Sequence, residues 1–284
     1  MSNNPLKGRF RAPKSYTRIP SDGRFYSEET ITQTETGEYP VFAMTSKDEI
    51  MMRNPDALLN GESVAQVINS CVPAVKKPRE LLGADVDALM VAINGATYGD
   101  TITMEATCPE CSNTTTTGAS VSSLLSTMAP VPENVDVVTP DDLTISIKPV
   151  TYETSIAAGV QNFQSTRSLQ SIATIDDDME RLKAFNESYM KLAQINFLVL
   201  VDSVYSISGT DEEGEEFIVT DRANILEYLE NCETAVGGLI TKAVTQISEA
   251  GIAKEVDVQC EHEECGHVFK SALEFDPVNF STAS

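Results

Sequence analysis

Apolar residues recur at helical spacing in two segments of the first third of the chain. In residues 61–71 they stand at i, i+3, i+4 and i+7, which predicts a helix with one buried face. These residues are Val64, Val67, Ile68 and Cys71. A second helix is predicted over residues 86–98, with Leu89, Met90 and Ile93 pointing inward and Gly99-Asp100 ending it.

A shorter helix is predicted before these two. Ser46 can cap its first turn, and Glu49, three residues later, completes a capping-box pattern. Asn54-Pro55 should end it, because proline cannot continue a helix that precedes it.

Alternation of apolar and polar residues predicts strands elsewhere. Residues 101–105 and 114–117 lie on either side of one cysteine-containing turn, and residues 256–258 and 268–275 lie on either side of another. Residues 143–150 predict a further strand, after a proline-rich linker at 128–140. Residues 19–42 should be β-rich, with a hairpin turn at Thr36-Gly37-Glu38.

Helical patterns dominate between residues 151 and 251. One helix is predicted to begin near Met179, where acidic residues favour the positive end of the helix dipole. Residues 189–205 are apolar on nearly every helical face, so we expect a central buried helix there. The rest of the segment predicts an exposed hairpin or loop and two more helices, at residues 208–217, 225–232 and 236–249.

Net charge separates a short basic arm from a long acidic body. The formal charge of the 284 residues is −23, yet residues 1–26 hold six basic side chains and only Asp22 as an acid. A body this acidic repels phosphate, so we do not expect it to bind nucleic acid. The arm could contact nucleic acid or an acidic protein surface, including another copy of this chain, or it could be a solvated terminus. Its candidate partner-binding residues are Lys7, Arg9, Arg11, Lys14 and Arg18.

No segment indicates secretion or a membrane. The first ten residues lack an apolar stretch. The longest apolar run, near residues 195–201, is far shorter than the roughly 20 residues that a bilayer requires. We therefore expect synthesis in the cytoplasm and no membrane contact.

Four of the six cysteines form two pairs that are far apart in the sequence. Cys108 and Cys111 have the two-residue spacing of a zinc knuckle, whereas four residues separate Cys260 from Cys265. Zinc in a structural site takes four such ligands in a closed tetrahedron. Four sulfur ligands are the leading hypothesis. Three sulfurs with His262 or His267, or no metal, remain alternatives. Cys71 and Cys232 stand alone in apolar contexts, and we expect both to be buried free thiols.

Other chemistry is sparse. A redox role for Cys108 and Cys111 would favour a helix start after a strand, but β-like sequence lies on both sides of the pair. The sequence has no phosphate-binding glycine loop, and both histidines lie in the second knuckle, which leaves none for a catalytic triad. We therefore expect no catalytic residues and no enzymatic activity.

Together these elements predict an α+β fold: a mainly helical body with a small β zinc ribbon made from two distant cysteine knuckles, and an extended N-terminal arm. The expected regions are an arm at 1–20, an α+β region with the first knuckle at 21–142, an inserted mainly helical lobe at 143–251, and the second knuckle with a closing β-hairpin at 252–284.

A series of short signatures resembles a known family. They are Pro20-Ser21-Asp22-Gly23-Arg24-Phe25-Tyr26, Met44-Thr45-Ser46-Lys47-Asp48-Glu49, Asn54-Pro55-Asp56-Ala57-Leu58-Leu59-Asn60-Gly61, Cys71, and Tyr98-Gly99-Asp100 before the Cys108 knuckle. In this order they resemble the base-plate hub protein family of large contractile-tailed bacteriophages. The resemblance covers roughly residues 19–121 and the closing knuckle, and much less of residues 143–250.

The resemblance implies a non-enzymatic part of the phage tail, found in the baseplate of the virion and contacting other tail proteins. Its alternative is an intracellular assembly factor, or chaperone, that is absent from the mature virion. A zinc-ribbon adaptor that binds nucleic acid is a third hypothesis. The longer second knuckle departs from the usual paired-cysteine spacing, which leaves its ligand set open.

Overall fold

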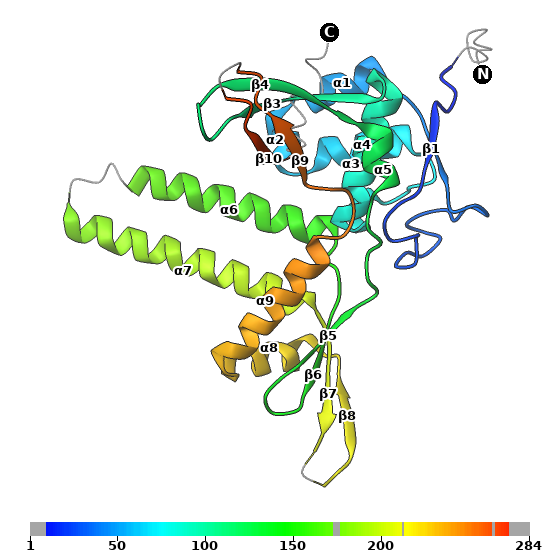
Figure 1. Ribbon diagram of the computed structural model, residues 1–284. Coiled ribbons are helices and arrows are strands. Elements are labelled where there is room, and N and C mark those ends of the chain that lie inside the picture. Colours follow the sequence, from blue (N-terminus) through cyan, green and yellow to red (C-terminus); the bar gives the residue numbers. More distant parts are fainter. Residues whose placement is uncertain (1–9, 173–176, 212, 263–264, 273–284) are drawn as a thin grey trace, which may run out of the picture. The chain divides into compact units, whose positions relative to one another are not determined.

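The computed structural model describes residues 10–172, 177–211, 213–262 and 265–272. The chain divides into two compact units (Figure 1): unit 1 is formed by residues 1–130 and 249–284, and unit 2 by residues 131–248. Helices and strands contribute to both units, so the fold is α+β. None of the described helices is long and apolar enough to cross a membrane.

Unit 1 begins with a short antiparallel pair, β1 (Ser15–Thr17) and β2 (Tyr39–Val41). The hairpin predicted within residues 19–42 is therefore wrong, although the chain does turn at Gly37, where φ is 69°. Instead of pairing with β2, Ile31 forms a bridge with Val75. Both segments are enclosed within unit 1, since Ile31 and Tyr39 are almost fully buried.

The helices of unit 1 are α1 (Ser46–Met52), α2 (Pro55–Leu59), α3 (Glu62–Cys71), α4 (Gly83–Tyr98) and α5 (Val121–Ser126), with a 3-10 turn at Pro78–Glu80. The predicted buried face of α3 is confirmed. The predicted cap of α1 was misplaced by one residue. Thr45 is the cap and forms a capping box with Asp48, whose buried carboxylate accepts the Thr45 backbone N–H at 2.7 Å.

Helix α4 is the buried helix of unit 1. Ala88, Leu89, Val91 and Ile93 on different faces of it are fully enclosed. Gly99 ends the helix with φ at 104°, a conformation that other residues rarely adopt.

Two β-hairpins complete unit 1: β3 (Thr101–Thr107) with β4 (Thr114–Ser120), and β9 (Glu255–Gln259) with β10 (Val268–Ala272). Residues 273–275 of the predicted last strand lie outside the described residues. The chain leaves for unit 2 and returns from it at one place, where Ala129 and Gly251 exchange backbone hydrogen bonds of 2.8 and 2.9 Å.

Unit 2 contains an antiparallel four-stranded sheet in the order β5-β6-β7-β8. Its strands are β5 (Val135–Val138), β6 (Thr144–Ile147), β7 (Val204–Thr210) and β8 (Glu216–Val219), and its helices are α6 (Tyr152–Ile172), α7 (Asp178–Ser203), α8 (Arg222–Asn231) and α9 (Thr234–Ser248). The strand predicted over residues 143–150 is confirmed as β6, and the hairpin alternative at 208–217 is confirmed by the pairing of β7 with β8. A four-stranded sheet was not expected, and β5 lies inside the predicted linker. Apolar side chains of β6 and β7 pack against α8 and α9 in one core cluster that includes Ile145, Ile207, Ile225 and Ile240.

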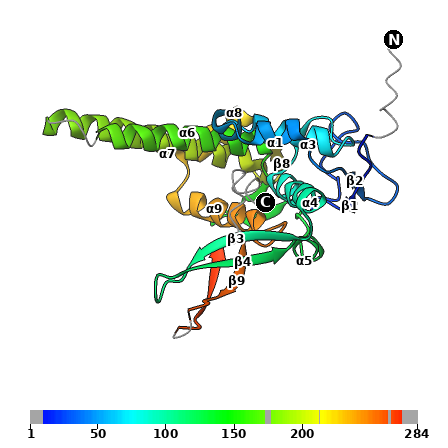
Figure 2. The same cartoon turned by 90° about the horizontal axis from the view of Figure 1, so that it is seen from above.

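The prediction of a central buried helix over residues 189–205 is wrong. Helix α7 pairs with α6 as a long hairpin (Figures 1 and 2), and only its last turns are buried, at Val201 and Ser203. The chain then becomes strand β7 at Val204. Tyr189 and Met190 are 60% and 67% exposed. An all-apolar pattern indicates burial only where other elements surround the helix, and most of α7 remains exposed on at least one side among the described residues.

Candidate metal centre

Two turns in unit 1 hold the four paired cysteines. Cys108 follows β3, and its backbone N–H donates to Asn113 O at 2.9 Å, which closes the first turn. Cys260 follows β9 and donates in the same way to His267 O at 2.8 Å, closing the second turn. Each hairpin therefore presents its cysteines from a turn that backbone hydrogen bonds fix in place.

The residue after the second cysteine has the same unusual conformation in both turns. Ser112, after Cys111, has φ of 57°, and Gly266, after Cys265, has φ of 56°. The left-handed backbone reverses the chain directly after each thiol and lets the next strand begin. Glycine adopts this conformation without strain, whereas serine does so at some cost. The wider spacing in the second turn thus ends in the same local geometry as the first.

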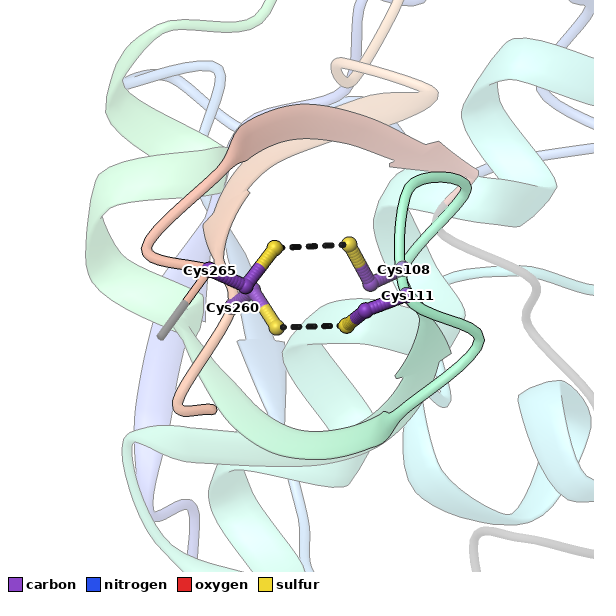
Figure 3. Close-up of side chains that lie close together, drawn as sticks. All are labelled: Cys108, Cys111, Cys260 and Cys265. Carbon is purple, nitrogen blue, oxygen red and sulfur yellow. Dashed lines mark hydrogen bonds between the residues drawn. The ribbon is translucent and has the colours of Figure 1, made fainter. Parts of the chain in front are cut away.

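The two turns bring all four sulfurs together (Figure 3). The Sγ atoms of Cys108 and Cys265 are 3.9 Å apart, and those of Cys111 and Cys260 are 3.5 Å apart. All four Sγ atoms lie within 4.8 Å of one another. A further contact joins the turns, because the Glu261 backbone N–H donates to Thr115 Oγ1 at 3.3 Å.

These separations suit a tetrahedral metal ion better than disulfides. Zinc–sulfur bonds of about 2.3 Å place the sulfurs at tetrahedral corners about 3.8 Å apart, close to the two separations above. A disulfide requires about 2.05 Å. Each close pair joins the first turn to the second, so a shared ion would cross-link two segments that lie 149 residues apart in the sequence.

The thiols of the cluster differ in pKa. Burial raises the pKa of Cys108, but backbone N–H groups of Cys111 and Glu110 outweigh it and lower the pKa to about 7. The pKa of Cys111 is raised, because burial and the neighbouring thiols outweigh a backbone hydrogen bond at Asn113. One thiolate therefore forms easily near neutral pH. Its negative charge opposes the ionisation of the neighbouring thiols. A divalent cation would remove that opposition and favour all four thiolates.

The two histidines fall outside this group of sulfurs. The ligand atoms that gather among the described residues all come from cysteines. The His267 ring stacks on Phe269, with ring centroids 6.2 Å apart. A site closed by four protein ligands has no open position for a substrate, so this geometry fits a structural ion.

The predicted partner-binding residues differ in their surroundings. Lys7 and Arg9 lie outside the described residues. Lys14 is exposed, and Arg18 lies 3.7 Å from Glu38 in an exposed ion pair. Arg11 is held by its own chain instead. Its guanidinium donates to Ser70 Oγ at 2.7 Å and lies 3.6 Å from the buried Asp48 carboxylate.

A second buried carboxylate explains part of the Pro20–Tyr26 signature. The Ser21 backbone N–H donates to Asp85 Oδ1 at 2.9 Å, and the Tyr26 hydroxyl donates to Asp85 Oδ2. Burial raises the pKa of Asp85, and the hydrogen bonds from Ser21 and Tyr26 act in the opposite direction. No sequence pattern predicts this pairing, because 64 residues separate Ser21 from Asp85.

Comparison with known proteins gives one match. A model of the family described as T4 bacteriophage base plate protein matches residues 15–278, nearly the whole chain and both cysteine turns. No curated protein and no solved structure matched the chain.

Proposed function

Because the chain belongs to the T4 bacteriophage base plate protein family, we propose that it is a non-enzymatic structural component of a contractile tail baseplate or its hub. The observation that carries this proposal is the family match over residues 15–278. The family implies a place in the virion tail and contacts with other tail proteins.

We further propose that one structural zinc ion, held by Cys108, Cys111, Cys260 and Cys265, stabilises unit 1. The sulfur separations and the four-cysteine ligand set support this proposal. When bound, the ion would supply a cross-link between the β3–β4 and β9–β10 turns. Thiolate ligands favour zinc over magnesium or calcium, which prefer oxygen.

Docking through the N-terminal arm is a separate part of the proposal. The arm candidates are Lys7, Arg9, Arg11, Lys14 and Arg18, of which Arg11 is engaged within unit 1 and Lys14 is exposed. Exposed cations on an otherwise acidic chain can guide the arm towards acidic neighbours in an assembly. Lys14→Glu should slow association with such a neighbour and leave the fold intact.

Mass spectrometry of purified virions tests the location. We expect peptides of this chain in intact particles, in a fixed ratio to other baseplate proteins. Peptides found in infected cells but missing from particles would contradict the structural proposal and favour the assembly-factor alternative.

A titration of fluorescent DNA with the purified chain tests the adaptor hypothesis. Weak binding that is insensitive to the arm is the expected result for a chain with a charge of −23. Salt-dependent nanomolar binding would contradict the structural proposal.

A further inference from the structure

Helix α7 carries a mainly apolar row on the side that α6 does not cover. Its members recur at intervals of three and four residues, so they lie along one side of the helix: Met179, Leu182, Asn186, Tyr189, Ala193, Asn196 and Leu200. We call this set the α7 row. Met179, Leu182 and Tyr189 are 78%, 57% and 60% exposed.

The α7 row continues a surface that is already used for packing. Leu200 and the adjacent Phe197 pack against the core of unit 2, next to the buried Val201. Towards the N-terminal end of α7, the same side of the helix has no such cover among the described residues of unit 2. Met190 and Phe185, which flank the row, are 67% and 48% exposed. An apolar stripe that extends beyond its own core over about 27 Å of helix marks a contact surface.

Charge favours a second copy of the chain as the occupant. Helices α6 and α7 together contain five acidic and four basic residues, so they carry −1 of the chain's −23. Two copies repel each other across most of their surfaces, because both are strongly acidic. The α6–α7 hairpin is a nearly neutral surface on which they can meet.

The α7 row also suits a copy of itself in the antiparallel direction. When the midpoint of the pair lies between Glu187 and Ser188, Leu182 of each copy faces the small Ala193 of the other. In the next layer, Asn186 faces Tyr189. Large residues thus meet small ones, and each contact occurs twice, as a two-fold interface requires.

We propose that the α7 row is the contact surface of a homodimer in which two α7 helices pack antiparallel. This inference goes beyond the baseplate assignment and does not depend on the metal. It concerns residues of unit 2 alone.

Sedimentation of the full chain over a range of concentrations tests the proposal. We expect a monomer–dimer equilibrium in the wild-type chain. Leu182→Lys places a charge in the contact and should raise the dissociation constant at least about tenfold. Ile218→Lys is the matched control, since Ile218 on β8 is 72% exposed and lies off the α7 row. Circular dichroism checks that both variants are folded.

Cross-linking tests the antiparallel register. The double variant Leu182→Cys/Ala193→Cys should form a disulfide between chains on oxidation, whereas each single variant should not. The two positions are about 16 Å apart on one helix and cannot bridge within a chain. A chain that stays monomeric, a dimer that Leu182→Lys leaves unchanged, or a double variant that does not cross-link would each overturn the proposal.

Discussion

Units 1 and 2 are held together by different kinds of contact. Unit 2 is one continuous segment whose sheet and helices share an apolar cluster that includes the fully buried Ile145 and Ile240. Unit 1 is assembled from two distant segments, and it encloses the carboxylates of Asp48 and Asp85. Its two segments meet at the cluster of four sulfurs.

The difference shows what a discontinuous unit requires. Closing a long loop has an entropic cost, which grows slowly with the length of the inserted segment. A small hairpin such as β9–β10 buries little apolar surface with which to offset that cost, and a two-stranded hairpin alone is marginal in water. A shared metal ion would supply the missing stabilisation, whereas unit 2 can rely on its core.

The largest expected effect comes from breaking the cysteine cluster. Cys111→Ser, or treatment with a strong chelator, should release the β9–β10 hairpin, because structural zinc contributes roughly 10–16 kcal/mol to the folding of small zinc domains. Hydrogen exchange should rise at β9 and β10 and stay slow at β6 and β7. Cys232→Ser is the matched control, since Cys232 lies in unit 2 and is not one of the four clustered cysteines. An equal rise in hydrogen exchange in both units would show that the cysteine cluster does not stabilise unit 1 specifically.

The apolar core of unit 2 gives the next largest effect. Ile145→Ala should lower the free energy of unfolding of unit 2 by about 2–5 kcal/mol, because it leaves a cavity beside α9. Ile218→Ala, at a 72% exposed position of the same sheet, should change it by less than about 0.5 kcal/mol. Chemical denaturation followed in each unit by hydrogen exchange measures both values. Similar losses for the two variants would show that unit 2 does not depend on this core.

The polar network of unit 1 should show a smaller effect. Tyr26→Phe removes the hydroxyl that donates to Asp85 and accepts from the Leu82 backbone N–H. We expect a loss of about 1–3 kcal/mol from unit 1, since a buried carboxylate loses one of its donors. Tyr16→Phe, at a 64% exposed tyrosine, serves as the control. A thermal melt in which the two variants coincide would contradict the network's role.

An effect of similar size concerns pH. Burial raises the pKa of Asp87 in the folded chain from 3.8 to about 6, and the Lys254 ammonium opposes this shift. The folded state therefore holds the proton more tightly than the unfolded state, so this residue's contribution to stability is lost as pH rises from about 4 to 6. Asp87→Asn should stabilise the chain at pH 7 by roughly 2–3 kcal/mol, relative to its effect at pH 4. Melting curves at both pH values measure the difference, and an equal effect at the two would show that Asp87 does not titrate in this range.

Local patterns predicted the parts of unit 1 whose burial follows from their own sequence. The apolar face of α3 was visible because periodicity and burial coincide there. The two cysteine turns were visible because their cysteines stand at the short spacings that a tetrahedral site would require. The approach of the two turns to one another was expected because such a site would need four ligands.

Other features depended on contacts that periodicity does not encode. Strand β2 pairs with β1 and not with the segment around Ile31. Ile31 forms a bridge with Val75 instead. Strand β5 of unit 2 was missed since it is four residues long and lies between prolines. Helix α7 was predicted to be buried, yet its apolar surface exceeds what the core of unit 2 can cover.

Metal analysis of the purified chain tests most directly whether the four clustered cysteines hold one zinc ion. Protein prepared without chelator should contain one zinc per chain, and X-ray absorption should show four sulfur neighbours at about 2.3 Å. The same result is expected for His262→Ala and His267→Ala. A folded chain that contains no metal, or a zinc ion with a histidine nitrogen among its ligands, would contradict a zinc site made of four sulfurs.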